Sequence, residues 1–191
     1  MIKELLVIGG LICITTVGNA QGYVNFNMNT SAGDFAVSAQ AFDVNGTTPL
    51  AGTGYYAQLY AADGWGSTSL LPKGSAVNFR SGGNAGYVMT SGTVNGNAVD
   101  PNVAVSLAPG NVTVQVRAWA SSFSSYEAAV QGGGKYGSSV SLNLTSAGGQ
   151  FLPANLNGLQ NFSLVGSAVP EPSTIALGVM GLSVLLFRRR K

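Results

Sequence analysis

The sequence contains no histidine and a single cysteine, Cys13, among its 191 residues. Without histidine, the chain cannot form the Ser-His or Cys-His pairs that activate most catalytic nucleophiles. It also lacks the side chains that bind most transition metals. We therefore expect a protein that is not an enzyme and that holds no cofactor or metal.

Charged residues are scarce as well, at 8% of the chain against about 25% in an average soluble protein. The positive net charge comes from a basic cluster at the C-terminus, and the stretch from Gln21 to Ala168 is close to neutral. A neutral region without a basic stripe offers no surface for phosphate contacts, so nucleic acid is excluded as a predicted partner. The charged residues of that stretch are Lys73, Arg80, Arg117 and Lys135 against Asp34, Asp43, Asp63, Asp100 and Glu127.

The N-terminus has the layout of a secretory signal peptide. Lys3 precedes an apolar run over residues 5–17, and small residues stand at Gly18 and Ala20. The apolar run is short for a bilayer span, so a retained anchor is the weaker alternative. We predict a signal helix over residues 1–20, cleavage between Ala20 and Gln21, and the Sec translocon and signal peptidase as partners.

The C-terminus has three parts in a fixed order: a proline motif, an apolar stretch over residues 175–187, and the basic run Arg188, Arg189, Arg190 and Lys191. Pro170 and Pro172 keep the chain extended and prevent a helix from starting before them. The apolar stretch reaches only about 20 Å as a helix, but arginines can snorkel and the bilayer can thin. We predict a transmembrane helix that holds the chain in the membrane, with the basic run on the cytoplasmic side.

Val-Pro-Glu-Pro-Ser-Thr, followed by a glycine-containing apolar helix and an arginine cluster, resembles the PEP-CTERM sorting signal of Gram-negative bacteria. In that family the tail is cleaved near the Pro-Glu-Pro by an exosortase, an integral membrane cysteine protease or transpeptidase. The resemblance implies that Pro170, Glu171 and Pro172 are the recognition residues and that the tail is removed. It covers about the last 23 residues.

Residues 21–168 are predicted to form one extracellular β-domain between the signal peptide at 1–20 and the sorting signal at 169–191. Short apolar and polar alternations, clearest over residues 112–119, are separated by turn pairs such as Asn45-Gly46 and Asp63-Gly64. We expect an all-β fold, an antiparallel β-sandwich whose jelly-roll or immunoglobulin-like topology stays open. One short helix is expected over residues 124–131, with a capping box of Ser124 and Glu127 and a stop at Gly132.

Two kinds of ligand contact are worth testing within this domain. Trp65 and Trp119 are candidate glycan contacts, because exposed aromatic rings stack on sugars. Asp43-Val44-Asn45-Gly46 has some features of a calcium loop, but it lacks the downstream glutamate, so a hairpin turn is the better interpretation.

The sequence therefore predicts an exported protein, held briefly in the inner membrane and then placed in the cell envelope, on the outer surface or in the extracellular matrix of a Gram-negative bacterium. Its expected role is structural or adhesive and linked to exopolysaccharide. A carbohydrate-binding module is the alternative. A carboxylate-dependent glycosidase is a third hypothesis, which requires two of Asp34, Asp43, Asp63, Asp100 and Glu127 to converge in a cleft.

Overall fold

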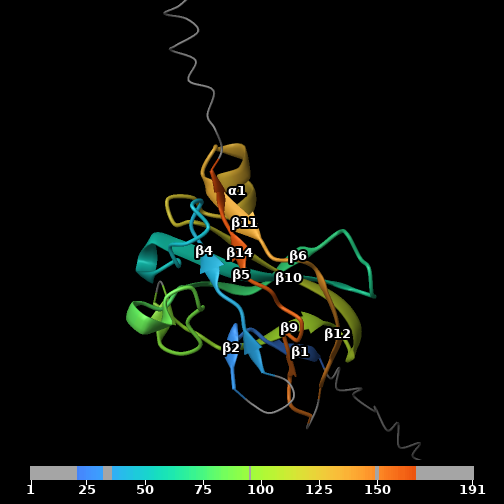
Figure 1. Cartoon of the computed structure of the whole chain (residues 1–191). Helices are drawn as coiled ribbons and strands as arrows, with labels where there is room; N and C mark the ends of the chain where they lie inside the picture. The colour runs from blue at the N-terminus through green and yellow to red at the C-terminus, as the bar shows by residue number, and fades with distance from the viewer. Residues whose placement is uncertain (1–20, 32–35, 95, 149–150, 167–191) are drawn as a thin grey trace, which may run out of the picture.

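The computed structural model describes residues 21–31, 36–94, 96–148 and 151–166, all within the predicted central domain. These residues form an all-β domain that carries the short helix α1 at one end (Figure 1). The predicted signal helix and transmembrane helix lie outside the described residues. In the described ranges, no helix has the length and apolar character needed to cross a membrane.

The strands of the first half are β1 (Gly22–Asn25), β2 (Asn29–Thr30), β3 (Val37–Ser38), β4 (Ala41–Phe42), β5 (Tyr55–Asp63), β6 (Leu71–Asn78), β7 (Thr93–Val94) and β8 (Asn97–Ala98). Those of the second half are β9 (Asn102–Ser106), β10 (Gly110–Ala120), β11 (Lys135–Ser138), β12 (Leu142–Ser146), β13 (Ala154–Asn155), β14 (Phe162–Ser163) and β15 (Val165–Gly166). The helices are α1 (Tyr126–Gln131) and the 3-10 turns η2 (Gly52–Gly54) and η3 (Gly82–Asn84).

The main sheet is built around the 11-residue strand β10. Its alternate residues from Val112 to Ala118 are buried, as the sequence predicts. One side of β10 pairs with β5 from Val112 to Ala120, while the other side pairs first with β12 and then with β11. The strand order β15-β11-β10-β5-β6, with β12 beside β10, makes this a six-stranded sheet.

A second, three-stranded sheet in the order β13-β1-β9 covers the inner face of the main sheet. Val24 of β1 and Val105 of β9 share one hydrophobic core with Leu59 of β5 and Val114 of β10. The all-β prediction is confirmed, and this two-layer arrangement is consistent with the predicted sandwich.

The prediction of purely antiparallel pairing is wrong for two short strand pairs. β1 runs parallel to β13, and β14 runs parallel to β4. Both pairs join segments more than 100 residues apart in sequence. The side-chain period of two marks a strand but carries no information on the direction of a distant partner.

Helix α1 lies where the sequence predicts a helix, but its cap is shifted by one residue. Ser125 is the N-cap, and its hydroxyl accepts a hydrogen bond from the amide of Ala128. The predicted capping box of Ser124 and Glu127 is therefore wrong. Glu127 instead turns toward the sheet, where its carboxylate accepts a hydrogen bond from Tyr60. Gly132 ends the helix as predicted.

Leu59→Ala tests the shared core, because Leu59 is fully buried between the two sheets. Truncating a buried leucine should lower the free energy of unfolding by about 2–5 kcal/mol. Urea unfolding followed by tryptophan fluorescence measures it, since Trp119 is buried in the folded protein. The exposed Val140→Ala is the matched control and should stay within about 0.5 kcal/mol of wild type. Equal losses in both variants would contradict this assignment of the core.

Candidate functional site

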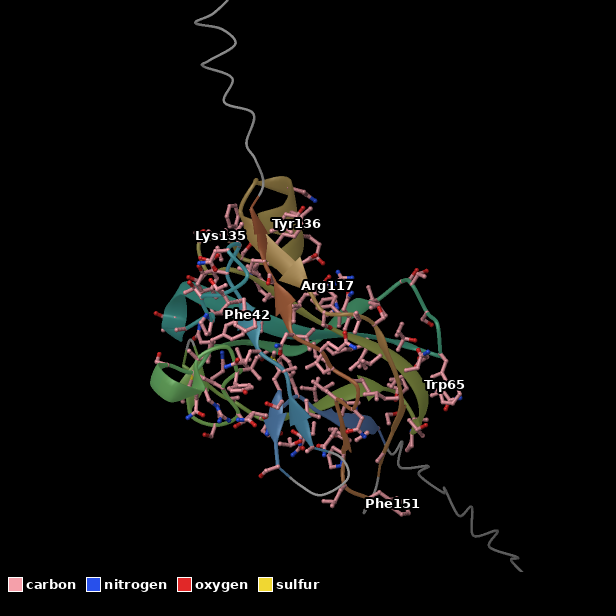
Figure 2. All side chains as sticks on the ribbon, in the orientation of Figure 1. Phe42, Trp65, Arg117, Lys135, Tyr136 and Phe151 are labelled. Carbon is pink, nitrogen blue, oxygen red and sulfur yellow. The ribbon has the colours of Figure 1, made fainter. Side chains whose placement is uncertain are left out.

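Trp65 stands on the surface in the loop between β5 and β6, with 60% of its area exposed (Figure 2). It lies between Gly64 and Gly66, which have φ angles of 85° and 75°. Such positive values favour glycine, so this tight turn depends on both neighbours. The turn presents the indole ring away from the sheet core.

Hydrogen bonds to the main sheet hold the Trp65 loop in place. The indole Nε1 donates to the carbonyl of Leu144 on β12 at 3.0 Å. The amide of Gly66 donates to the Asn143 side chain at 3.1 Å, and the Thr113 hydroxyl donates to the carbonyl of Gly64 at 2.8 Å. The ring is thus exposed but fixed at one edge. Because the side chain is already ordered, binding of a ligand costs less conformational entropy.

Trp119, the other predicted glycan contact, is only 1% exposed. Its Nε1 donates to the carbonyl of Phe123 at 3.0 Å, and its ring packs against Tyr56 with centroids 6.0 Å apart. The predicted pair of exposed tryptophans is therefore wrong. Trp119 does point to the outer face of β10, but the segment leading to α1 covers it.

Helix α1 also covers a second group of rings on the outer face. Tyr126 of α1 packs edge-on against Tyr60 of β5 and Tyr136 of β11. Arg117 of β10 lies 4.1 Å from the centre of the Tyr60 ring, and its guanidinium pairs with Glu127 at 3.4 Å. Burial, followed by the hydrogen bond to Glu127, holds the pKa of Tyr60 far above its ordinary value. Both Tyr60 and Glu127 therefore serve in packing this face.

The carboxylates of Asp43, Asp100 and Glu127 have separate partners in different parts of the fold. Glu127 belongs to the contact with Arg117 and Tyr60, and Asp100 accepts a hydrogen bond from the amide of Asn102 just before β9. Asp63 ends β5, and Asp34 lies outside the described residues. In the described part of the chain, no three acidic, histidine or cysteine side chains gather where they could hold a metal ion.

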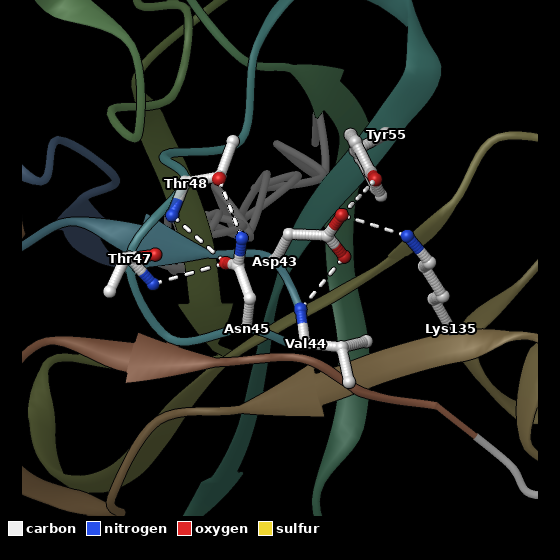
Figure 3. Close-up of polar contacts among 7 residues, drawn as sticks. All are labelled: Asp43, Val44, Asn45, Thr47, Thr48, Tyr55 and Lys135. Carbon is white, nitrogen blue, oxygen red and sulfur yellow. Dashed lines mark hydrogen bonds and ion pairs between the residues drawn. The ribbon is translucent and has the colours of Figure 1, made fainter.

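Asp43 and Asn45 form a closed turn after β4 (Figure 3). The Asn45 side chain accepts hydrogen bonds from the amides of Thr47 and Thr48 at 3.1 and 2.9 Å. Asp43 accepts from the amide of Val44 and from Lys135 of β11, both at 2.8 Å. The oxygens that would bind calcium are engaged within the protein, which supports the hairpin interpretation over a calcium loop.

The ion pair of Asp43 and Lys135 changes the pKa of both groups. Burial acts to raise the pKa of Asp43, but hydrogen bonds from Lys135, Val44 and Tyr55 outweigh it and hold that pKa below its ordinary value. The hydrogen bond to Asp43 raises the pKa of Lys135. The pair joins the turn after β4 to β11 across 92 residues of sequence.

A groove that the sequence does not predict lies between β6 and β9, with a volume of about 230 Å³. It forms where β6 bulges away from β5 at Gly74, whose carbonyl accepts a hydrogen bond from Gln58. Asn97, Asp100 and Asn102 supply polar groups, and small residues form most of the remaining lining. Among the described residues, none of those that line this groove is aromatic, so this lining offers no ring on which a sugar could stack.

The predicted processing residues fall almost entirely outside the described ranges. Gln21, the first described residue, is exposed, and its side chain accepts a hydrogen bond from Tyr23. Ala20, the recognition residues Pro170, Glu171 and Pro172, and the basic run Arg188, Arg189, Arg190 and Lys191 are not described. Gly166, the last described residue, lies on β15, which pairs with β11 next to α1, whereas the first strand β1 lies toward the other end of the domain (Figure 1).

Asp43→Asn tests the ion pair through the dependence of stability on pH. Because the folded pKa of Asp43 lies below the unfolded one, its carboxylate stabilises the fold at neutral pH. That contribution is lost as pH falls through the folded pKa. Between about pH 5 and pH 3, the free energy of unfolding should therefore fall less steeply in Asp43→Asn than in wild type, as measured by urea unfolding at each pH.

Lys135→Met supplies the control for this experiment. In Lys135→Met, the free energy of unfolding should fall with pH less steeply than in wild type but more steeply than in Asp43→Asn, since Lys135 supplies one of the hydrogen bonds to Asp43. The double variant should show the same pH dependence of stability as Asp43→Asn, because the ion pair is already absent in Asp43→Asn. Parallel curves for wild type and Asp43→Asn would contradict the role given to this pair.

The comparisons with known proteins identify one feature of the chain, its C-terminal motif. The family model for the PEP-CTERM protein-sorting motif matches residues 168–191. No curated protein and no solved structure matches the chain. The match confirms the resemblance found in the proline motif, the apolar stretch and the basic run. The chain thus carries a PEP-CTERM protein-sorting motif, which indicates an exported protein that is sorted by an exosortase after a transient stay in the membrane.

Proposed function

We propose that this protein is a non-catalytic structural or adhesive component of the cell envelope or the extracellular matrix, and that it contacts exopolysaccharide through Trp65. The observation that carries the proposal is the exposed ring of Trp65, fixed at its edge by the hydrogen bond to Leu144. The sorting motif supplies the context, because it indicates export and handling by an exosortase.

The surroundings of Trp65 suit a neutral sugar. Asn143 and Thr145 are exposed on the neighbouring strand β12, on either side of the residue that holds the indole. An indole face can stack on the C–H groups of a sugar ring, while amides and hydroxyls at its border can bond the sugar hydroxyls. The near-neutral charge of the domain fits a polysaccharide better than a strongly charged ligand.

Because the Trp65 ring is exposed, a carbohydrate-binding module is the second candidate function. The burial of Trp119 speaks against it, since a dedicated sugar platform usually needs more than one ring. The separate partners of Asp100 and Glu127 support a non-catalytic role, because a glycosidase needs two carboxylates facing one bond. An adhesive contact requires only weak binding at each copy of the protein, multiplied over many copies.

In this proposal Pro170, Glu171 and Pro172 are the residues that the exosortase recognises. The signal peptide ends at Ala20, and Arg188 to Lys191 stay in the cytoplasm while the apolar stretch is in the membrane. Processing then places the domain on the outer surface or in the matrix of a Gram-negative cell. The family match over residues 168–191 supports recognition by an exosortase and the transient stay in the membrane.

Trp65→Ala tests the glycan contact. Loss of the indole should weaken binding to insoluble exopolysaccharide from the host by about tenfold, or about 1.4 kcal/mol. Co-sedimentation of the exported protein with the polysaccharide measures it. Phe151→Ala is the matched control, since Phe151 is an aromatic residue with 80% exposure elsewhere on the surface (Figure 2). If both variants bind as wild type does, Trp65 is not the contact.

Replacing Pro170, Glu171 and Pro172 with alanine tests sorting. The wild-type protein recovered from the envelope and medium of the host should begin at Gln21 and end near Pro172, as intact mass shows. The variant should keep its tail because the exosortase no longer recognises it. A wild-type chain that still ends at Lys191 would mean that the tail is a simple membrane anchor.

A further inference from the structure

Two Asn-Gly pairs in the described part of the chain lie in surface turns and are held very differently. Asn45-Gly46 belongs to the turn after β4, and Asn157-Gly158 lies between β13 and β14. In an Asn-Gly pair the backbone nitrogen of the glycine can attack the asparagine side chain, because glycine has no side chain to hinder the approach. The fold therefore decides how reactive each pair is.

The peptide unit between Asn157 and Gly158 is exposed and free to turn. Among the described residues, no hydrogen-bond partner is found for the Asn157 side chain, the Asn157 carbonyl or the Gly158 amide. The flanking residues close the turn instead, since the amide of Leu159 donates to the carbonyl of Leu156 at 3.0 Å and both leucines are buried. Gly158 has a φ of 86°, and without a side chain it also tolerates negative values. The peptide unit can thus turn over between two β-turn forms while the leucines stay in the core.

Asn45 is held by three hydrogen bonds of its side chain (Figure 3). Its oxygen accepts from the amides of Thr47 and Thr48, and its nitrogen donates to the Thr48 hydroxyl at 2.7 Å. The amide of Gly46 donates to the carbonyl of Asp43 at 2.8 Å. Both the group that would be attacked and the attacking nitrogen are therefore engaged, so a reaction at Asn45 requires these bonds to break first.

We propose that Asn157 is a site of spontaneous deamidation in the folded protein, and that Asn45 is protected from it. The nitrogen of Gly158 attacks the side-chain carbon Cγ of Asn157, so a bond forms between these atoms and the bond from Cγ to Nδ2 breaks. Ammonia leaves with the proton of the Gly158 amide, and a cyclic succinimide remains. Water then opens the ring at either of its two carbonyls, which gives aspartate or isoaspartate.

This reaction changes both the charge and the backbone of the turn. Residues 21–168 are close to neutral, so one new carboxylate shifts their net charge by about one unit at neutral pH. Isoaspartate also carries the main chain through the side-chain carbon, which lengthens the backbone between the buried Leu156 and Leu159. A more acidic form of the protein therefore accumulates with age.

Ageing the protein recovered from the host in a mildly alkaline buffer tests the inference. Trypsin cuts after Lys73 and after Lys135, so Asn45 and Asn157 fall on different peptides. Mass spectrometry with fragmentation locates each conversion of asparagine to aspartate and gives its rate. We expect Asn157 to convert faster than Asn45 by about tenfold or more, since Asn45 must first give up several hydrogen bonds.

The same protein unfolded in urea is the control for the effect of the fold. Both pairs lose their turns there, so the two rates of conversion should become nearly equal. Asn157→Gln is the matched variant, because it keeps the amide but its longer side chain would have to close a larger ring. The folded variant should gain no acidic form on isoelectric focusing while the wild-type protein does.

A folded protein in which Asn157 converts no faster than Asn45 would overturn the inference. Conversion of Asn157 in urea alone would overturn it as well, because the native turn would then protect this residue. If Asn45 stayed slow in urea, the neighbouring sequence and not its hydrogen bonds would be the cause, and the protection assigned to the fold would be wrong. None of these outcomes depends on sorting or on contact with a glycan.

Discussion

Strand β10 is hydrogen-bonded to three other strands, and the rest of the domain is arranged around it. Its alternating sequence fixes the register, because a slip by one residue would expose Val112, Val114 and Val116 and bury their polar neighbours. With that register set, β5 and β12 present their apolar sides to the same core. The sheet of β1 and β9 covers this face, and the outer face remains for other contacts.

The outer face of the main sheet is covered by other segments at one end and carries an exposed aromatic ring at the other. At the end of β10 near Trp119, α1 and Arg117 cover the rings of Tyr60 and Tyr136. At the other end, near Thr113, the loop of Trp65 folds onto the sheet and leaves one ring exposed. Aromatic residues over the outer face of the main sheet thus have different roles, and each role is decided by the cover that the residue receives from another segment of the chain.

That division explains which predictions the sequence could support. The alternation over residues 112–119 and the helix ending at Gly132 are local signals, and the structure confirms both. The exposure of Trp119 is not a property of β10 alone, because it depends on how the segment between β10 and α1 folds back over the sheet. The same holds for the parallel pair of β1 and β13 and for the groove at Gly74, which arise from segments far apart in sequence. The sorting motif was recognisable because its three parts are contiguous.

The two ends of β10 also separate the two activities proposed for the chain. β15 lies level with Trp119, with β11 between them, while the Trp65 loop rests on Thr113, six residues away from Trp119 along β10. Six residues of strand span about 20 Å. A domain held at its α1 end by the membrane or by the sorting enzyme therefore keeps Trp65 well away from that attachment. In the proposed function, contact with a polysaccharide and processing of the tail therefore use different ends of the domain, so neither has to wait for the other.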